Sequence, residues 1–301
     1  MKTKQWLVFI LLGIIWSSSF LWIKIGVQEV GPMSLVAFRM LFGALTAGVI
    51  AYFQGIPFSR DWKDWGIFAI FGPLSLAIPI FLISWGEQTI DSAVASILNA
   101  TVPLFTLIIA HFWLSDDKIT FQKTLGLLIG FGGVVILLSK DLLASAHASV
   151  IGQVAVILAS LFYAVSAVGI RKYTTHINNV MRGVGLLTTS AILMWIVGPI
   201  FERPFEIPRL PITWIAALWL GILGSGLAMI MMYYLIHEIG PTRASLVTYL
   251  FPVGGVLLGV FFLDEQLSWQ LIAGTILIIM SLVVVNYKPR TSASNSVKRA
   301  G

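Results

Sequence analysis

Long apolar segments that carry almost no charge constrain this chain more than any other feature of its sequence. A helix needs about 20 apolar residues to cross the roughly 30 Å hydrocarbon core of a bilayer. The chain contains ten such segments, and short connectors rich in Gly, Pro and charged residues separate them. The segments are residues 6–23, 33–53, 65–86, 92–113, 120–139, 150–170, 179–200, 212–235, 244–263 and 268–287. The sequence therefore predicts an all-α polytopic membrane protein with ten transmembrane helices.

The composition excludes several other classes of protein. Charged residues make up 11% of the 301 residues and hydrophobic residues 58%, whereas a soluble domain carries about 25% charged residues. A soluble enzyme and a disordered protein are therefore excluded. The net charge of +6 is spread between the apolar segments, which favours a lipid bilayer over nucleic acid as the partner. The chain has no Cys, and we predict no cofactor and no metal.

The distribution of basic residues predicts the orientation of the chain, because cytoplasmic connectors are enriched in Lys and Arg. With both termini in the cytoplasm, 14 of the 19 Lys and Arg residues lie on the cytoplasmic side and 5 on the other side. The sequence thus predicts an integral protein of a bacterial cytoplasmic membrane with both termini inside. We interpret the first apolar segment as an uncleaved helix, and we expect the basic tail at residues 288–301 to be disordered.

The two halves of the chain repeat each other. Residues 117–126 and 265–274 both consist of an acidic residue, a short polar turn and a glycine that opens the next apolar segment, 148 residues apart. We therefore predict two repeats of five spans, at residues 6–139 and 150–287. Because five is odd, the second repeat enters the membrane from the opposite side, and such inverted repeats are typical of carriers. A duplication that merely enlarged a helical bundle is the alternative.

These features resemble those of the drug/metabolite transporter superfamily, and specifically a ten-helix member of the EamA type. The resemblance rests on residues 16–20 (WSSSF) leading to Lys24, on Arg39, and on the two segments with an acidic residue, a turn and a glycine; it covers residues 6–287. It implies export or exchange of small metabolites, often amino acids, through a cavity between the halves. The second half departs from the pattern, because Arg182 is out of register with Arg39.

Two matching stripes of small and polar residues are candidates for a substrate site. They lie at helical spacing on one face of the fourth and ninth apolar segments, so they face another helix or a water-filled cavity. Each proline leaves the carbonyl four residues earlier unpaired. Close packing of kinked helices is the alternative to ligand binding. The stripes are Ser96, Asn99, Pro103, Thr106 and Ala110, and Ser245, Thr248, Pro252, Gly255 and Gly259.

Aromatic and hydroxyl side chains one helical turn apart add further candidates, since they can stack on and hydrogen-bond to an amphipathic metabolite. These pairs are Trp16 with Ser19 and Tyr163 with Ser166, and Tyr249 lies next to Thr248. Core packing of the aromatic rings is the alternative. The predicted substrate-binding residues are Trp16, Ser19, Arg39, Asn99, Pro103, Tyr163, Ser166, Thr248, Tyr249 and Pro252.

Arg39 lies about 9 Å from the end of the second apolar segment at 1.5 Å per residue. A buried arginine is energetically costly, and it is usually paired or functional. It could bind a substrate carboxylate in a bidentate contact. It could also pair with Glu87 or Asp91, or extend to the interface.

The sequence favours a carrier of small metabolites. No acidic residue lies near the middle of an apolar segment, which favours facilitated export or exchange over proton coupling. A membrane enzyme would need a cluster of acidic or histidine residues that the sequence does not show. The remaining alternative is a membrane scaffold or assembly protein that does not transport. A glycine stripe at Gly126, Gly130 and Gly133 predicts close helix packing within the chain or in a homodimer.

Overall fold

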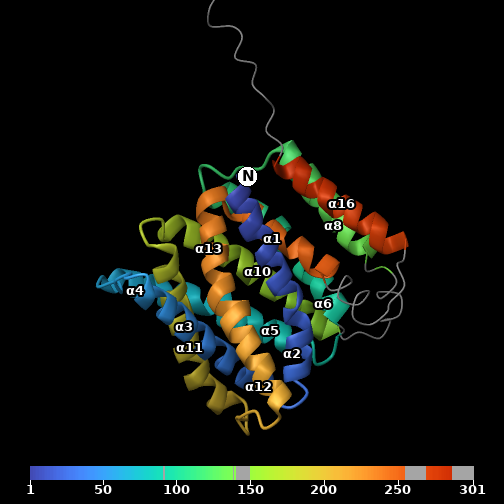
Figure 1. The fold of residues 1–301 in the computed structure, drawn as a ribbon. Coiled ribbons are helices and arrows are strands. Elements are labelled where there is room, and N and C mark those ends of the chain that lie inside the picture. The colour runs from blue at the N-terminus through green and yellow to red at the C-terminus, as the bar shows by residue number, and fades with distance from the viewer. Residues whose placement is uncertain (91, 138, 140–149, 255–268, 287–301) are drawn as a thin grey trace, which may run out of the picture.

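The fold was analysed in a computed structural model, which describes residues 1–90, 92–137, 139, 150–254 and 269–286. Every regular element in these residues is a helix (Figure 1). Six helical segments in this part of the chain are long and apolar enough to cross a membrane, which agrees with the prediction of an all-α polytopic membrane protein. They are Thr3–Gly26, Pro32–Phe53, Trp62–Gly86, Val150–Tyr173, Asn179–Phe201 and Pro211–Ile239.

The first half of the chain contains two uninterrupted spans and three interrupted spans. Helices α1 and α2 meet at Ser18, and a π-helical segment, η1, joins α4 to α5. The elements are α1 (Thr3–Ser17), α2 (Ser19–Gly26), α3 (Pro32–Phe53), α4 (Trp62–Gly72), η1 (Pro73–Ala77), α5 (Ile78–Gly86), α6 (Ser92–Asn99), α7 (Val102–Trp113) and α8 (Phe121–Leu137).

The second half follows a similar order. A second π-helical segment, η2, interrupts the eighth predicted span, which is the counterpart of the third. The elements are α10 (Val150–Tyr173), α11 (Asn179–Phe201), α12 (Pro211–Leu218), η2 (Trp219–Leu227), α13 (Ala228–Ile239), α14 (Pro241–Ser245), the 3₁₀ segment η3 (Leu246–Tyr249) and α16 (Trp269–Asn286).

Local sequence explains where these helices begin and end. Proline occupies the first turn of α3, α12 and α14, where its missing N–H costs no helical hydrogen bond. Gly240 ends α13 with φ at +83°, a backbone conformation that glycine adopts without strain. Asn178 accepts a hydrogen bond from the backbone N–H of Val180 and so caps α11.

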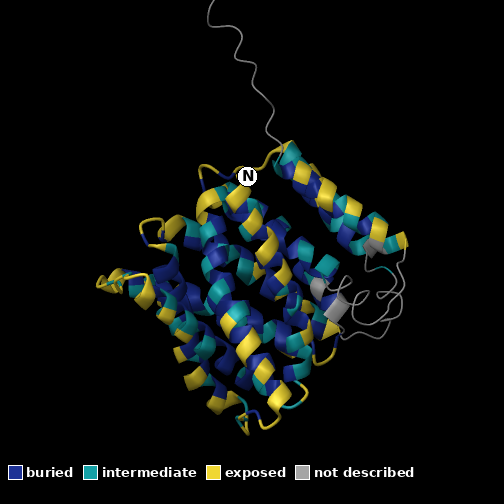
Figure 2. Ribbon diagram, in the orientation of Figure 1, coloured by how far each residue is buried: buried dark blue, intermediate teal, exposed yellow. Residues whose placement is uncertain are grey.

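The outer surface of the helices is apolar, as a bilayer requires. About half of each long span is buried inside the protein, and exposed residues follow the outer faces of the helices (Figure 2). These faces carry large hydrophobic side chains such as Leu7, Ile14, Leu45, Ile70 and Ile196. A soluble protein rarely exposes so continuous an apolar surface, so the pattern agrees with lipid contact.

The two halves interlock in a reciprocal manner. Helix α3 of the first half packs against η2 of the second, and α11 of the second packs against η1 and α4 of the first. Helices α3 and α11 also pack against each other, as do α8 and α16. The α8–α16 pair lies at one edge of the molecule (Figure 1). Equivalent spans of the two halves therefore pack against each other. The π-helical segments lie where the two halves are in contact.

Two predicted spans differ in detail from continuous helices. The fourth, predicted as one kinked helix, is divided by a turn at residues 100–101, and Pro103 starts the new helix α7. The ninth begins with the short elements α14 and η3 before residues 250–254 become helical again. The predictions at Asp91, Gly255 and Gly259, most of the segment 265–274 and the tail 288–301 lie outside the described residues.

Candidate functional site

A cavity of about 100 Å³ lies between the two halves, and side chains from both halves line it. Its wall is mostly apolar, with polar side chains from both halves. The apolar lining residues are Trp16, Phe20, Ile23, Ile80, Ile83, Val102, Ala167, Ile170, Met229, Met232, Ile236 and Phe251. The polar lining residues are Ser19, Arg39, Ser75, Asn99, Tyr163, Ser166, Tyr233, Ser245 and Thr248.

Arg39 brings a positive charge to the cavity wall. It lies on α3 and its side chain is buried. Its Nε donates to the hydroxyl of Ser225 at 2.8 Å, and its Nη2 donates to the carbonyl of Gly224 at 3.4 Å. The described residues place no carboxylate in an ion pair with Arg39. The guanidinium is therefore held in position by neutral groups and keeps an uncompensated charge beside the cavity.

Trp16 and Ser19 form an adjacent part of the wall. The indole N–H of Trp16 donates to the carbonyl of Gly224 at 2.9 Å, and its ring packs edge to face against Phe251 with 5.8 Å between ring centroids. The buried hydroxyl of Ser19 has no hydrogen-bond partner among the described residues. A bound ligand can supply that partner, because buried polar groups are normally hydrogen-bonded.

The first span of the second half provides matching residues. Ser166 of α10 donates to the carbonyl of Leu74, which belongs to η1, at 3.2 Å. In the first half, the indole N–H of Trp16 makes a similar contact with the carbonyl of Gly224 of η2. Tyr163 lies one turn before Ser166 and lines the cavity, as Arg39 does. The irregular π-helical backbone thus offers carbonyl groups to side chains of the opposite half at two related positions.

Asn99 and Thr248 reach the cavity from the two interrupted spans. Asn99 is the last residue of α6, and its side-chain oxygen is 3.5 Å from the hydroxyl of Ser160. Thr248 lies in η3 and donates to the carbonyl of Ser245 at 3.0 Å. The helix breaks that follow from the proline positions therefore place one polar side chain from each half in the same cavity.

Three predicted site residues lie elsewhere. Pro103, Tyr249 and Pro252 are not among the residues that line the cavity. The hydroxyl of Tyr249 donates to the carbonyl of Leu127 at 2.9 Å and so attaches η3 to α8. The periodicity placed Pro103 and Pro252 on the same helical faces as Asn99 and Thr248, but the helix breaks turn the faces apart. Tyr249 was a candidate because it is adjacent to Thr248 in the sequence.

The glycine stripe of α8 packs within the chain. A Cβ atom at Gly130 would collide with the ring of Tyr249, and one at Gly133 would lie 2.9 Å from the carbonyl oxygen of Gly274 on α16. A Cβ atom at Gly126 would lie 2.5 Å from Val285, also on α16. These glycines therefore permit the close approach of α8 to η3 and α16.

Sequence reasoning missed or undervalued several residues of the site. Tyr233 is fully buried at the cavity, and its hydroxyl has no hydrogen-bond partner in the described part of the chain. Interfacial tyrosines are common, so a tyrosine near the end of an apolar segment is a weak candidate on sequence alone. Ser75 and Ser225 lie in the π-helical segments. The glycines at residues 219–227 are the sequence signal that could have drawn attention to η2.

The second buried arginine has a different role. Arg182 of α11 donates to the carbonyls of Thr174 and Ile177 and to the side chain of Asn179. These acceptors belong to the connection between α10 and α11 and to the first turn of α11. Arg182 therefore stabilises this connection and does not line the cavity.

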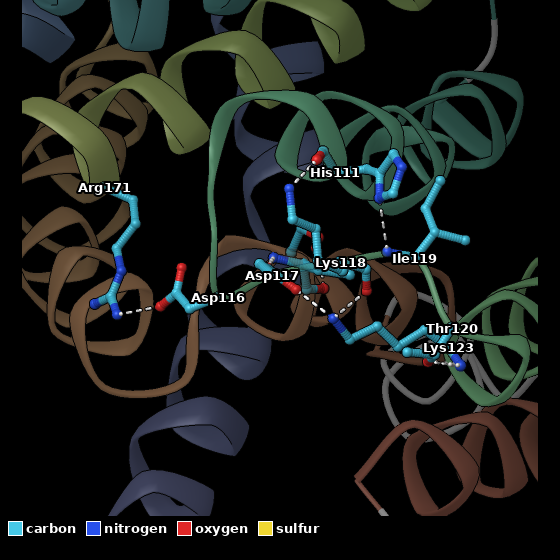
Figure 3. A network of polar contacts seen from close by, with 10 residues as sticks. His111, Asp116, Asp117, Lys118, Ile119, Thr120, Lys123 and Arg171 are labelled. Carbon is cyan, nitrogen blue, oxygen red and sulfur yellow. Dashed lines mark hydrogen bonds and ion pairs between the residues drawn. The ribbon is translucent and has the colours of Figure 1, made fainter.

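A cluster of charged residues lies at the end of the protein that carries the N-terminus (Figure 3). Asp117 forms an ion pair with Lys123 and accepts a hydrogen bond from the backbone N–H of Thr242 at 3.1 Å. Asp116 pairs with Arg171 of α10 at 3.2 Å. The cluster joins the connection between α7 and α8 to the start of α14 and the end of α10, so it ties the two halves together.

Comparison with known proteins places the chain in a family. The model of the EamA-like transporter family matches residues 4–139 and, separately, residues 150–287. The chain belongs to the EamA-like transporter family. An uncharacterized transporter of Bacillus subtilis, YoaV, is 25% identical over 91% of this chain and 94% of its own length.

Another transporter is similar in sequence, and one solved structure shows a similar fold. An uncharacterized inner membrane transporter of Escherichia coli K12, YedA, is 28% identical over 85% of this chain and 82% of its own length. A protein of known crystal structure, whose sequence is 20% identical, superposes on this chain with a TM-score of 0.78. The match covers 95% of this chain and 98% of that chain. The protein is therefore an integral membrane transporter with relatives in the bacterial inner membrane.

Proposed function

We propose that this protein exports or exchanges small metabolites that carry a carboxylate, such as amino acids, by alternating access. The observation that carries the proposal is the uncompensated guanidinium of Arg39 at the wall of the central cavity. The planar guanidinium group of arginine binds a carboxylate through two parallel charged hydrogen bonds, which are stronger than neutral hydrogen bonds. The apolar remainder of the wall, with Trp16 and Phe251, favours a substrate with a hydrophobic side chain.

The arrangement of the halves supports alternating access. We infer that residues 6–139 and 150–287 are inverted repeats, as the two separate matches of the family model and the reciprocal packing of α3 on η2 and α11 on η1 suggest. Two inverted copies of one fold can exchange their conformations, which opens the cavity first to one side and then to the other. The distribution of Lys and Arg supports a cytoplasmic location for both termini.

The candidate contacts within the cavity follow from its geometry. Arg39 would bind the carboxylate, Trp16 and Phe251 would contact the apolar side chain, and Ser19 would donate or accept a hydrogen bond. Asn99 and Thr248 would contact the substrate from the interrupted spans. A scaffold without transport would have no use for an unpaired buried charge beside a cavity, which is why we prefer the carrier.

Transport by reconstituted vesicles tests the proposed substrate class. Vesicles loaded with a mixture of the standard amino acids should take up labelled amino acids by exchange, and the matching amines without a carboxylate should not compete. Arg39→Gln should reduce exchange about thirtyfold, because a charged hydrogen bond contributes about 2 kcal/mol and 1.4 kcal/mol corresponds to a factor of ten.

Arg39→Lys is the matched control, since it keeps the charge and loses the planar fork. It should retain more exchange than Arg39→Gln. Equal competition by amines and amino acids, or unchanged exchange in Arg39→Gln, would exclude the guanidinium as the carboxylate site.

A further inference from the structure

Glu87 is an acidic residue that the proposed substrate site does not use. It directly follows the span Trp62–Gly86, and its side chain is 0% exposed. Its backbone N–H donates to the carbonyl of Ile83 at 2.9 Å, and Ile83 lines the cavity. Glu87 therefore lies one helical turn beyond the cavity wall, at the end away from the cluster of Asp116 and Asp117.

The carboxyl group of Glu87 lacks partners. Neither of its oxygens receives a hydrogen bond from any residue that the structure describes. The ammonium group of Lys24 lies nearby, but it donates to the backbone carbonyl of Glu87 at 2.7 Å and forms no ion pair with the carboxyl group. An ionised carboxylate that is buried without donors is strongly disfavoured, so this carboxyl group holds a proton.

Two other acidic residues on the connections at this end, Glu29 and Glu202, are bound differently. Glu202 accepts hydrogen bonds from the backbone N–H groups of Met33 and Ser34, at 2.8 and 2.9 Å. Glu29 accepts hydrogen bonds from two backbone N–H groups at the start of α12. Both carboxylates cap helix N-termini, where negative charge is stabilised. Among these three residues, Glu87 alone is buried without a donor.

The elements packed around Glu87 bring little other charge. Helix α2 contributes Lys24, and α3 contributes Arg39, which is bonded to η2. The facing end of α10 and the whole of α6 contain no charged residue, and Asp91 lies outside the described residues. Burial raises the pKa of Glu87 to about 8, and Lys24 opposes part of this effect. Its proton can therefore be lost within the physiological range of pH.

We propose that Glu87 is a proton-binding site that controls the adjacent end of the cavity. The carboxyl group holds its proton while this end is closed. When the end opens, the proton leaves to water, and the resulting carboxylate pairs with the ammonium group of Lys24. This inference rests on the proposed alternating-access function, because it assigns protonation to one of the two states. It also supplies a site for proton coupling, which the sequence alone disfavoured.

Infrared spectroscopy of the full-length protein in detergent tests the proton site without any substrate. The carbonyl band of a protonated carboxyl group should disappear as pH rises through about 8, and it should be absent from Glu87→Gln above about pH 6, where ordinary carboxyl groups are ionised. Lys24→Gln should shift the midpoint upward, since it removes a cation that favours the carboxylate. Glu202→Gln is the matched control and should leave the band unchanged. A band that persists in Glu87→Gln, or that is missing from the parent protein near neutral pH, would overturn the proposal.

A single cysteine tests whether protonation controls access. The parent chain has no Cys, so Ile83→Cys can report access to this end of the cavity in the purified protein. Its labelling by a polar thiol reagent should rise about tenfold more in the parent background than in Glu87→Gln between about pH 7 and pH 9, because the deprotonated fraction of a carboxyl group with a pKa of about 8 rises about tenfold over this range. Both backgrounds carry the same cysteine, so the effect of thiol ionisation on the labelling rate is common to both and drops out of the comparison.

The two measurements separate this inference from the proposed function. Equal labelling in both backgrounds would reject control by Glu87, whether or not the protein transports amino acids. A failure of amino-acid exchange in the vesicles would reject the proposed substrate, and the infrared and labelling results would still decide the role of Glu87.

Discussion

At the scale of single residues, the protein keeps two buried ionisable groups whose partners are incomplete. Arg39 is held by Ser225 and by the carbonyl of Gly224, and Glu87 has no donor for its carboxyl group in the described part of the chain. Buried charges are normally paired. For Arg39 we propose a substrate carboxylate as the partner, and for Glu87 a bound proton that keeps the carboxyl group neutral.

The protonation of Glu87 predicts a dependence of stability on pH. Its pKa rises from 4.5 to about 8 on folding, so between these values the folded protein holds a proton that the unfolded chain has lost. Stability then falls as pH rises through this window and levels off above it. The melting temperature of Glu87→Gln should therefore exceed that of the parent by a margin that grows by a few degrees from about pH 5 to pH 8. A margin that stays constant with pH would mean that Glu87 has an ordinary pKa.

The sequence predicted residue types better than residue environments. Arg39, Asn99 and Thr248 stood out because polar side chains are rare in apolar segments, and all three line the cavity. The sequence also suggested Glu87 as a partner for Arg39, but the structure gives Arg39 neutral acceptors from η2. Such partners come from a span of the other half, and sequence spacing carries no information about contacts at that distance.

At the scale of elements, irregular helices determine the site. The π-helical segments η1 and η2 expose the carbonyls of Leu74 and Gly224 to Ser166 and Trp16. Hydropathy located the spans that contain these segments, because it depends on composition over about 20 residues. It did not reveal the π-helical turns or the break at residues 100–101, since these depend on local backbone hydrogen bonds that Pro73, Pro103 and the glycines of η2 alter.

The charged cluster in Figure 3 also joins elements, because it connects the two halves at one end of the protein. Asp117→Asn removes the charge from the hydrogen bond that Asp117 accepts from the backbone N–H of Thr242 in the other half, and a charged hydrogen bond exceeds a neutral one by about 1 kcal/mol. The cavity should then open more often at this end, and a polar thiol reagent should label a cysteine at Ile170 up to about fivefold faster. Asp116→Asn is the control. Asp116 is 60% exposed in its pair with Arg171, so this pair should contribute little. Equal effects of the two variants on labelling would show that Asp117 does not hold this end of the cavity closed.

At the scale of the whole molecule, the account depends on two similar halves that share one cavity. The family model matches each half separately; each half contains one π-helical segment and contributes residues of an interrupted span to the cavity. Composition and repetition were sufficient to predict this plan from the sequence. The relative placement of the halves was not predictable in the same way, because it results from close packing between spans far apart in the chain, such as α3 with α11 and α8 with α16.

Accessibility of the cavity from both sides of the membrane tests alternating access most directly. Thr248→Cys places one thiol in the cavity of a chain that otherwise has none. In sealed vesicles of each orientation, an impermeant thiol reagent added outside should label this cysteine in both preparations, and a transported amino acid should slow the labelling. Labelling in only one orientation, or in neither, would contradict a cavity that opens to both sides in turn.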